Sequence, residues 1–329
     1  MGRPLVLEPR EKITSLRLTS CERNEMDARA EALGFKSLSD YLRHLHKAAV
    51  ATEKNKETNI ELEKYGTLLE SHSTALGKIY QGNSLAYMHS HAGQNSVDLI
   101  LTSPPFGLVR KKSYGNEDAD AYCDWFRPFA EGFKRVLKDD GSLVIDVGGA
   151  WKSGTPTRSL YHFKLLIMLG EEGGVQLAQE HWWWNPSKLP SPAEWVNVRR
   201  VRVKDAINCV WWLSKTPFPR ANNKRILSPY SDSMRTLLKN GYKAKMRPSG
   251  HDISSNFSVD NGGSVPPNLL AIANTESNGA YQDYCRENNI EIHPARFPAL
   301  LPEYFIRFLT NPGDMVLDPF GGSCITGMV

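Results

Sequence analysis

A short stretch at the end of a predicted strand contains the first residues that could do chemistry. Ser103-Pro104-Pro105-Phe106 follows the run Asp98-Leu99-Ile100-Leu101-Thr102, which is typical of a buried strand. Neither proline can donate a backbone hydrogen bond, and Pro105 forces Pro104 into an extended conformation, so the strand must end there. The sequence therefore predicts a rigid corner that displays a hydroxyl, proline carbonyls and a flat ring.

A second stretch of this kind lies near the end of the chain. Asp318-Pro319-Phe320-Gly321-Gly322-Ser323 follows the predicted strand Met315-Val316-Leu317. An acid at a strand end, followed by a glycine-containing loop, allows backbone to approach a nucleotide-like ligand. Each stretch is a weak signal alone, because prolines commonly end strands and many turns contain paired glycines. Their joint occurrence at two strand ends is a much stronger indication of a site.

The predicted elements around these stretches alternate between strands and helices. Buried strands are predicted at 97–101 and 142–147, with a helix at 122–136 and a turn at 138–141 between them. Another helix is predicted within 298–309. This order predicts an open α/β sheet with parallel crossovers, in which ligands bind at the carboxyl ends of the strands.

The segment between the two stretches is strongly basic. Residues 185–250 contain 14 Lys and Arg but only three Asp and Glu, and several aromatic residues, including Trp211 and Trp212, are interleaved with them. This excess is larger than the net charge of the whole chain, +4, so a surface that contacts phosphate is favoured over an ordinary solvated face. Residues 249–288 are rich in Ser, Asn and Gly and are predicted to form loops. The predicted DNA-contacting residues of this segment are Arg199, Arg200, Arg202 and Lys204.

Length and composition limit the class of protein. The 329 residues suffice for one large domain and a small one. Five scattered cysteines without metal-ligand spacing indicate reduced thiols and no metal site. The sequence has no apolar run of transmembrane length and no signal-peptide pattern, which predicts a soluble, cytoplasmic protein without a membrane partner. The predicted parts are an N-terminal segment (1–50), a helical linker (51–76) and a main domain (77–329), with a basic insert at about 185–290.

The N-terminal segment has its own pattern. Residues 12–19 alternate like a short strand, with Ser15 and Arg17 on one face. Two helices are predicted to follow, each beginning at a serine that can cap it, Ser20 and Ser37. A strand and two helices of this size cannot bury a core alone, which suggests dimerisation.

This order of elements resembles the ribbon-helix-helix family of DNA-binding domains. In that family, strands from two chains pair and lie in the major groove of DNA. The resemblance implies a homodimer in which Ser15 and Arg17 face base edges, with Arg17 as the candidate for a guanine contact. The alternative is an ordinary helical oligomerisation segment.

The two chemical stretches together resemble motifs of the S-adenosylmethionine-dependent DNA amino-methyltransferases. In that family, Thr-Ser-Pro-Pro-Phe/Tyr is the catalytic motif and Asp-Pro-Phe-x-Gly-Ser is the cofactor loop. The catalytic motif comes first in this chain, which is the permuted order known as the beta group. Ser96–Ile100 and His293–Pro298 match supporting segments, so the resemblance covers about residues 78–329. It implies a Rossmann-like methyltransferase sheet with helices on both faces.

The resemblance also implies a role for each motif residue. The Ser103 hydroxyl and the Pro104 carbonyl would accept hydrogen bonds from an exocyclic base amine, which favours a tetrahedral nitrogen that can attack a methyl group. The prolines would hold that carbonyl in place, and Phe106 would stack on a base rotated out of the duplex. The implied catalytic residues are Ser103, Pro104, Pro105 and Phe106. The residues implied to bind the cofactor, S-adenosyl-L-methionine, are Asp318, Phe320, Gly322, Ser323, Phe297 and Pro298.

The serine of the catalytic motif, Ser103, predicts the base. In the family, Ser usually accompanies cytosine N4, whereas Asp or Asn accompanies adenine N6. The sequence thus predicts a site-specific cytosine-N4 methyltransferase of double-stranded DNA, the modification partner of a restriction system. An adenine-N6 enzyme and a DNA-binding regulator with an inactive methyltransferase half are the alternatives. The chain stops at Val329, before a strand that would supply an acid to the cofactor ribose, which favours a fragment over a truncated copy.

Overall fold

The computed structural model describes residues 20–48, 64–90, 93–108, 112, 115–241, 245–246, 248, 252–253, 259–275 and 280–329. The chain divides into two units, Met1–Ile60 and Glu61–Val329, which are treated separately. The predicted strand at 12–19, with Ser15 and Arg17, lies outside the described residues.

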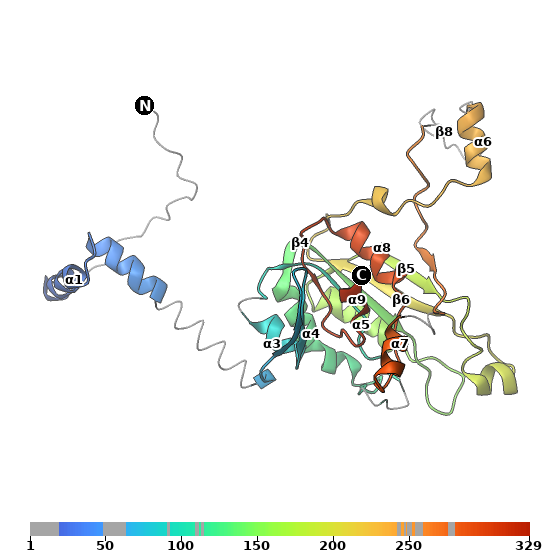
Figure 1. Ribbon diagram of the computed structural model, residues 1–329, viewed down its shortest axis with the longest axis horizontal. Helices are drawn as coiled ribbons and strands as arrows, with labels where there is room; N and C mark the ends of the chain where they lie inside the picture. The colour runs from blue at the N-terminus through green and yellow to red at the C-terminus, as the bar shows by residue number, and fades with distance from the viewer. Residues whose placement is uncertain are drawn as a thin grey trace. The chain divides into compact units, whose positions relative to one another are not determined.

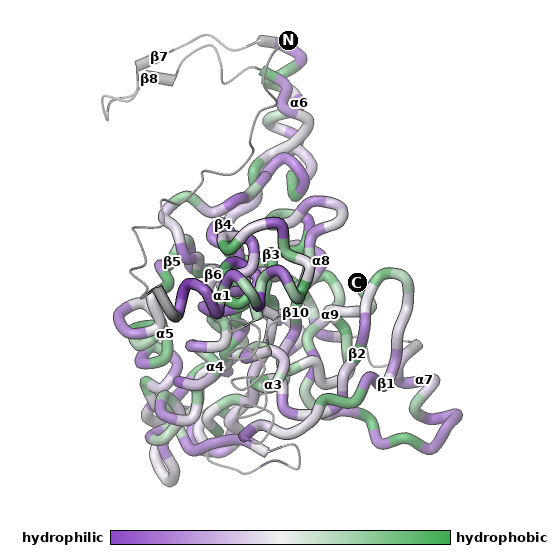
Figure 2. Tube along the Cα trace, turned by 90° about the vertical axis from the view of Figure 1, so that its left-hand side faces the viewer, coloured by the Kyte–Doolittle hydropathy of each residue, from purple (hydrophilic) through white to green (hydrophobic). Residues whose placement is uncertain are grey.

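The N-terminal unit contains the two predicted helices. Helix α1 (Ser20–Ala32) ends before Gly34, whose φ of +77° is the left-handed conformation typical of a glycine after a helix. The second helix, 38–48, begins after Ser37, whose hydroxyl accepts a hydrogen bond from the Asp40 amide (3.2 Å) and donates one to the Asp40 carboxylate (2.8 Å). Figure 2 shows α1 as predominantly hydrophilic, which leaves few apolar side chains for a core in this unit.

The larger unit begins with a small hairpin, not with a continuous linker helix. Strand β1 (Leu69–Ser73) pairs antiparallel with β2 (Lys78–Gln81), so the prediction of a helix throughout 51–76 is wrong over β1. The Thr74 hydroxyl accepts hydrogen bonds from the Leu76 and Gly77 amides and closes the turn. Helix α3 (Ser84–His89) follows, capped by Asn83.

The main sheet has six strands in the order β10-β3-β4-β6-β5-β9. Strands β10, β3 and β4 are parallel, as predicted, whereas β6 runs antiparallel to both β4 and β5, and β5 is parallel to β9. The predicted parallel crossover is found from β3 to β4, whereas the connection from β5 to β6 returns at the same edge of the sheet and makes β6 antiparallel. The bounds are β3 (Val97–Thr102), β4 (Leu137–Gly148), β5 (Gln176–Trp184), β6 (Ile207–Ser214), β9 (Leu269–Ala271) and β10 (Val316–Leu317).

Helices cover both faces of this sheet, as Figure 1 shows. Helices α3, α4 (Tyr122–Val136) and α5 (Tyr161–Glu171) pack on one face, and α8 (Leu300–Leu309) packs on the other. Successive residues of β3 alternate between the two cores, with Ile100 facing α4 and Leu99 facing α8. The predicted α/β class with two covered faces is confirmed.

Several local predictions are corrected inside the large unit. The predicted turn at 138–141 is a bulge within β4, because the pairing of β3 with β4 shifts there. Trp211 and Trp212 are buried in the central strand β6 and therefore belong to the core, not to a DNA-contacting surface. The predicted loops at 249–288 include β9 and helix α7 (Ala280–Glu287).

The remaining elements are short. They are the helical turns at Glu194–Val198 and Asn223–Ile226, helix α6 (Asp232–Asn240), strands β7 (Lys245–Met246) and β8 (Asp252–Ile253), and helix α9 (Ile325–Met328). Figures 1 and 2 both show α6 projecting away from the sheet. Within the described ranges, no helix has the length and apolar character needed to cross a membrane.

Candidate active site

The structure brings the two chemical stretches together at one edge of the sheet. Val316 and Leu317 of β10 pair in parallel with Leu99 and Ile100 of β3, so Asp318 emerges beside the end of β3. The Thr102 hydroxyl donates a hydrogen bond of 2.6 Å to Asp318 Oδ1 across this boundary. Two segments separated by more than 200 residues in sequence thus form one site at the carboxyl ends of adjacent strands.

Ser103 is held by a buried carboxylate that comes from the next strand. Its hydroxyl donates to Asp146 Oδ2 at 3.0 Å, and Asn208 of β6 donates through Nδ2 to Asp146 Oδ1, also at 3.0 Å. Burial raises the pKa of Asp146 to about 6, against the opposing effects of the Asn208 and Ser103 hydrogen bonds and the Lys188 charge. A serine whose proton is donated to a carboxylate keeps its oxygen lone pairs as acceptors.

The prolines and the aromatic ring of the corner are also fixed by neighbours. Tyr122 of α4 donates its hydroxyl to the Pro105 carbonyl at 2.7 Å. The half-buried ring of Phe106 packs on Gly148 at the end of β4, so closely that a Cβ at Gly148 would collide with Phe106 Cε2. Pro104 is buried. The corner is therefore braced by α4 and β4 and is rigid, as the two prolines predict.

The loop after β10 is organised by the carboxylate of Asp318. Besides Thr102, the Thr326 hydroxyl donates to Asp318 Oδ2 at 2.7 Å, and the Phe320 amide donates to Oδ1 at 3.1 Å. Burial raises the pKa of Asp318, and these three donors oppose the shift. All the donors come from the loop or its neighbouring elements, so Asp318 holds the loop in shape.

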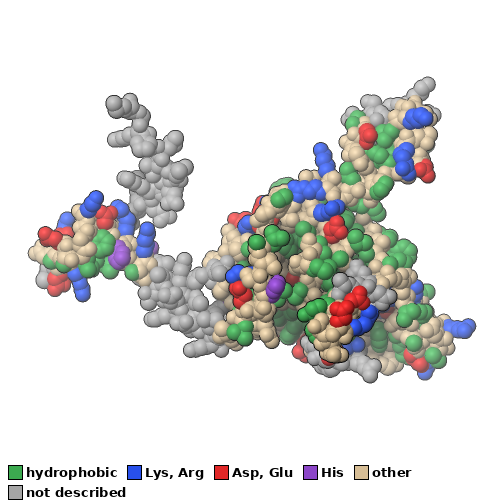
Figure 3. All heavy atoms as spheres, viewed as in Figure 1, with side chains coloured by type: hydrophobic (Ala, Val, Ile, Leu, Met, Phe, Trp, Pro, Cys, Tyr) green, Lys and Arg blue, Asp and Glu red, His purple; other side chains and the backbone are tan. Residues whose placement is uncertain are grey.

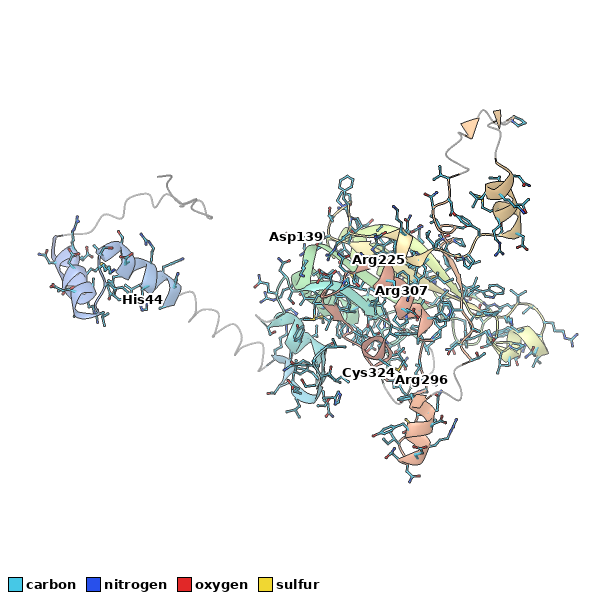
Figure 4. All side chains as sticks on the ribbon, turned by 45° about the horizontal axis from the view of Figure 1, so that its top comes forward. His44, Asp139, Arg225, Arg296, Arg307 and Cys324 are labelled. Carbon is cyan, nitrogen blue, oxygen red and sulfur yellow. The ribbon has the colours of Figure 1, made fainter. Side chains whose placement is uncertain are left out.

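The other predicted cofactor residues surround this loop. Gly322 is exposed at a φ of +51°, and the His293 ring lies where a side chain at Gly322 would point, 3.3 Å from a Cβ placed there. The ring of Phe320 packs on Phe129 of α4, with centroids 4.8 Å apart. Ser323 is half-buried and directly precedes Cys324, which is labelled in Figure 4.

Phe297 and Pro298 lie just before α8. The Phe297 ring lines a cavity of about 10 Å³ together with Thr102 and Asp146, which is too small for more than one water molecule. Pro298 is buried, and its carbonyl accepts a hydrogen bond of 3.0 Å from Leu301 at the start of α8. Phe297 therefore connects the Asp146 and Asp318 parts of the site.

The predicted DNA-contacting residues lie on the loop from β5 to β6, at the same edge of the sheet. Arg199 pairs with Glu194 at 2.8 Å and lies over the Trp195 ring, and Arg200 is exposed. Lys204 donates to two backbone carbonyls, and Arg202 is largely buried against an acid, so these two also stabilise the loop. Figure 3 shows further Lys and Arg side chains on the α6 projection.

Sequence reasoning missed the residues that hold the motif residues in place. They are Thr102, Tyr122, Asp146, Asn208 and Thr326. One of them carried a visible signal, because Asp146 interrupts the otherwise apolar run Leu143-Val144-Ile145-Asp146-Val147 of a predicted buried strand. Among the described residues, no group of three His, Cys, Asp or Glu could hold a metal ion.

Comparisons with known proteins identify the class that this fold and site define. The family described as DNA methylase matches residues 97–329, and the chain belongs to it. S-adenosyl-L-methionine is the methyl donor of this family, as predicted.

Individual relatives agree with this assignment. The chain is 53% identical to Type II methyltransferase M.PvuII of Proteus hauseri over 262 residues, which are 79% of this chain and 78% of that protein. It is 28% identical to Type II methyltransferase M.BglII of Bacillus subtilis over 77% of this chain and 62% of that protein. A solved structure of the PvuII DNA methyltransferase (cytosine-N4-specific) superimposes with a TM-score of 0.64 and 45% identity, covering 80% of each chain.

Proposed function

We propose that this protein transfers a methyl group from S-adenosyl-L-methionine to cytosine N4 at a specific site in double-stranded DNA, as the modification partner of a restriction system. The observation that carries the proposal is the hydrogen bond from Ser103 to Asp146 at the end of β3. The relative that is 53% identical carries the name of a Type II methyltransferase, and the superimposed solved structure carries the description cytosine-N4-specific. The catalytic stretch precedes the cofactor stretch, which supports the beta order of motifs.

The residues of the corner activate the base amine by accepting its hydrogen bonds. The exocyclic nitrogen is a poor nucleophile while its lone pair is delocalised into the ring. The Ser103 oxygen and the Pro104 carbonyl draw its N–H groups out of the ring plane, which localises the lone pair. Phe106 stacks against the extruded base.

The proton that the amine loses passes to the carboxylate behind the serine. Ser103 Oγ accepts the amine proton and gives its own proton to Asp146 Oδ2. A carboxyl with a pKa of about 6 is ionised near pH 8 and can accept this proton. Asn208 holds the second oxygen of Asp146 during the transfer.

The loop after β10 fits the methyl donor. Asp318 fixes the loop through three hydrogen bonds, and Gly322 exposes its backbone in a left-handed turn that leaves no Cβ in the way. Gly322, Ser323 and Phe297 would contact S-adenosyl-L-methionine, which supplies a methyl group on a positively charged sulfur when bound. Phe320 and Asp318 would act by positioning this loop.

The test is to identify the modified base and its sequence context. The full-length gene is expressed in cells that lack DNA methylation, and their DNA is analysed by single-molecule sequencing and by mass spectrometry of nucleosides. We expect N4-methylcytosine at one recurring site, and no modification with Ser103→Ala. N6-methyladenine without N4-methylcytosine would overturn the base assignment, and unmodified DNA with the unaltered protein would favour a regulator.

We also propose that the N-terminal unit is a ribbon-helix-helix-like dimer that binds DNA in the cytoplasm. Supporting this, α1 and the helix at 38–48 bury Ala30 (3% exposed) and Tyr41 (4%) but leave Leu33 62% exposed. Light scattering of the full chain should give the mass of a dimer, and Arg17→Ala should weaken DNA binding while transfer at saturating DNA is kept. A monomer whose DNA affinity does not respond to Arg17→Ala would contradict the proposal.

A further inference from the structure

A cluster of two arginines and one acid lies beside the end of β4, and it joins Arg202, one of the predicted DNA-contacting residues, to an arginine that the sequence analysis did not single out. Arg158 comes from the loop after β4, and Arg202 and Asp205 come from the loop between β5 and β6. Arg158 Nη1 lies 2.6 Å from Asp205 Oδ1, and Arg202 Nη2 lies 2.9 Å from the same oxygen. This arginine cluster joins the two loops.

The loop of Arg158 is closed by backbone hydrogen bonds. Trp151 and Arg158 form an isolated antiparallel bridge, and the Ser159 amide donates to the Ala150 carbonyl at 2.9 Å. The Arg158 guanidinium lies directly on Gly149, where any Cβ would collide with it. The Arg158 side chain is therefore held in place by the backbone at Gly149 and by the Asp205 carboxylate.

The cluster is close to the corner that holds Ser103. Gly149 follows Gly148, on which the Phe106 ring packs. Burial raises the pKa of the Cys209 thiol in β6 to about 12, while the charge of Arg158 opposes that shift and the charge of Asp146 adds to it. One thiol thus experiences both the arginine of the cluster and the acid behind the serine.

The charges of the cluster do not balance. Two guanidinium groups share one carboxylate, and Arg202 Nη1 is buried without a hydrogen-bond partner among the described residues. Arg158 remains 34% exposed at its side chain. Guanidinium groups with unused donors and a net positive charge match the geometry of a phosphate.

We propose that Arg158 and Arg202 bind the backbone phosphate next to the extruded nucleotide, with Asp205 orienting both side chains. This inference rests on the proposed base extrusion but not on which base is modified. A phosphate held at the end of β4 fixes the sugar of the extruded nucleotide, and its base then reaches Ser103. A merely structural ion cluster would instead join the two loops without contacting DNA.

The test combines the replacement of single DNA phosphates with the substitution of single arginines. Duplexes that contain the site found by sequencing are made with one uncharged methylphosphonate at each position around the target base. The dissociation constants of the unaltered chain, Arg158→Gln and Arg158→Lys are measured by fluorescence anisotropy at several salt concentrations. Arg127→Gln on α4, where Arg127 pairs with Asp124 and Glu172, is the control for a loss of one charge elsewhere.

We expect one methylphosphonate next to the target to weaken binding of the unaltered chain about 10-fold. Arg158→Gln should weaken binding to the unmodified duplex by about the same factor. Its affinity should not fall further when that one phosphate is replaced, and the slope of log affinity against log salt should decrease by about one. Arg158→Lys should keep part of the phosphate dependence. The proposal would be overturned if each methylphosphonate weakened binding of Arg158→Gln as much as it weakens binding of the unaltered chain. It would also be overturned if Arg158→Gln lowered the midpoint of thermal unfolding but left the DNA affinity unchanged. Because binding is measured, a failed assignment of cytosine N4 leaves this result interpretable.

Discussion

The site contains two carboxylates at one edge of the sheet, the buried Asp146 near the end of β4 and the half-buried Asp318 after β10. Burial raises the pKa of both, so both resist ionisation for the same reason. They differ in what donates to them. Asp318 receives three hydrogen bonds from Thr102, Thr326 and the Phe320 amide, whereas Asp146 receives two, from Ser103 and Asn208.

This difference separates a structural acid from a chemical one. The donors to Asp318 belong to the loop and its flanking elements, so its charge holds the loop that would contact the methyl donor in the proposed function. One donor to Asp146 is Ser103, which faces the base in the proposed function, so a change in the charge of Asp146 would be transmitted to the reacting amine. The different partners of the two acids therefore support different roles for them in the proposed function.

The largest expected effect comes from removing the charge of Asp146. Asp146→Asn keeps the size of the side chain but presents an N–H to the Ser103 oxygen, which then loses an acceptor lone pair and its proton acceptor. We expect the rate of methyl transfer in single-turnover assays to fall about 1,000-fold, equivalent to about 4 kcal/mol. The affinity for S-adenosyl-L-methionine, measured by calorimetry, should stay within about twofold.

A double-mutant cycle tests whether the acid acts through the serine. If Asp146 acts only through Ser103, the variant that combines Asp146→Asn with Ser103→Ala should be no slower than the slower single variant. Losses that multiply would show instead that Asp146 affects the reaction independently of the serine, and the distinction between the two acids would lose its basis.

The sequence assigned a role to Asp318 but not to Asp146, and the reason is physical. Asp318 follows a predicted strand and precedes paired glycines, which is a local pattern. Asp146 lies inside a strand, and its partners Ser103 and Asn208 come from β3 and β6, so only the pairing of strands reveals its contacts.

The same limit explains the successes and errors in the fold. The helix α4 and the parallel pairing of β3 and β4 followed from local periodicity and element order. The antiparallel direction of β6 and the burial of Trp211 did not, because a run of aromatic residues beside arginines suits either a core strand or a basic surface. The corner was predictable because two consecutive prolines restrict the backbone locally.

The second effect concerns the dependence of stability on pH. The pKa of Asp146 rises from 3.8 to about 6 on folding, so its contribution to stability is fully present below pH 4 and is lost as the pH rises through 6. Asp146→Asn cannot titrate. From pH 4 to pH 7, the unaltered protein should lose about 2 kcal/mol of unfolding free energy relative to this variant, measured by denaturant titration. Asp318 is present in both proteins and cancels in the difference. If the stabilities of the two proteins changed in parallel with pH, folding would not raise the pKa of Asp146, and the contrast with Asp318 would fail.

The smallest effect tests Asp318 through one of its donors. Thr326→Val keeps the shape of a buried side chain and removes one of the three hydrogen bonds, so we expect a loss of about 1 kcal/mol of stability. Because the loop loosens, the affinity for S-adenosyl-L-methionine should fall about fivefold, while single-turnover transfer at saturating donor stays unchanged. Thr310→Val is the matched control, because the buried Thr310 hydroxyl donates only to the Ile306 carbonyl within α8. It should lose similar stability and keep its donor affinity. Equal donor affinities for the two variants would show that the hydrogen bonds to Asp318 stabilise the fold without shaping the loop.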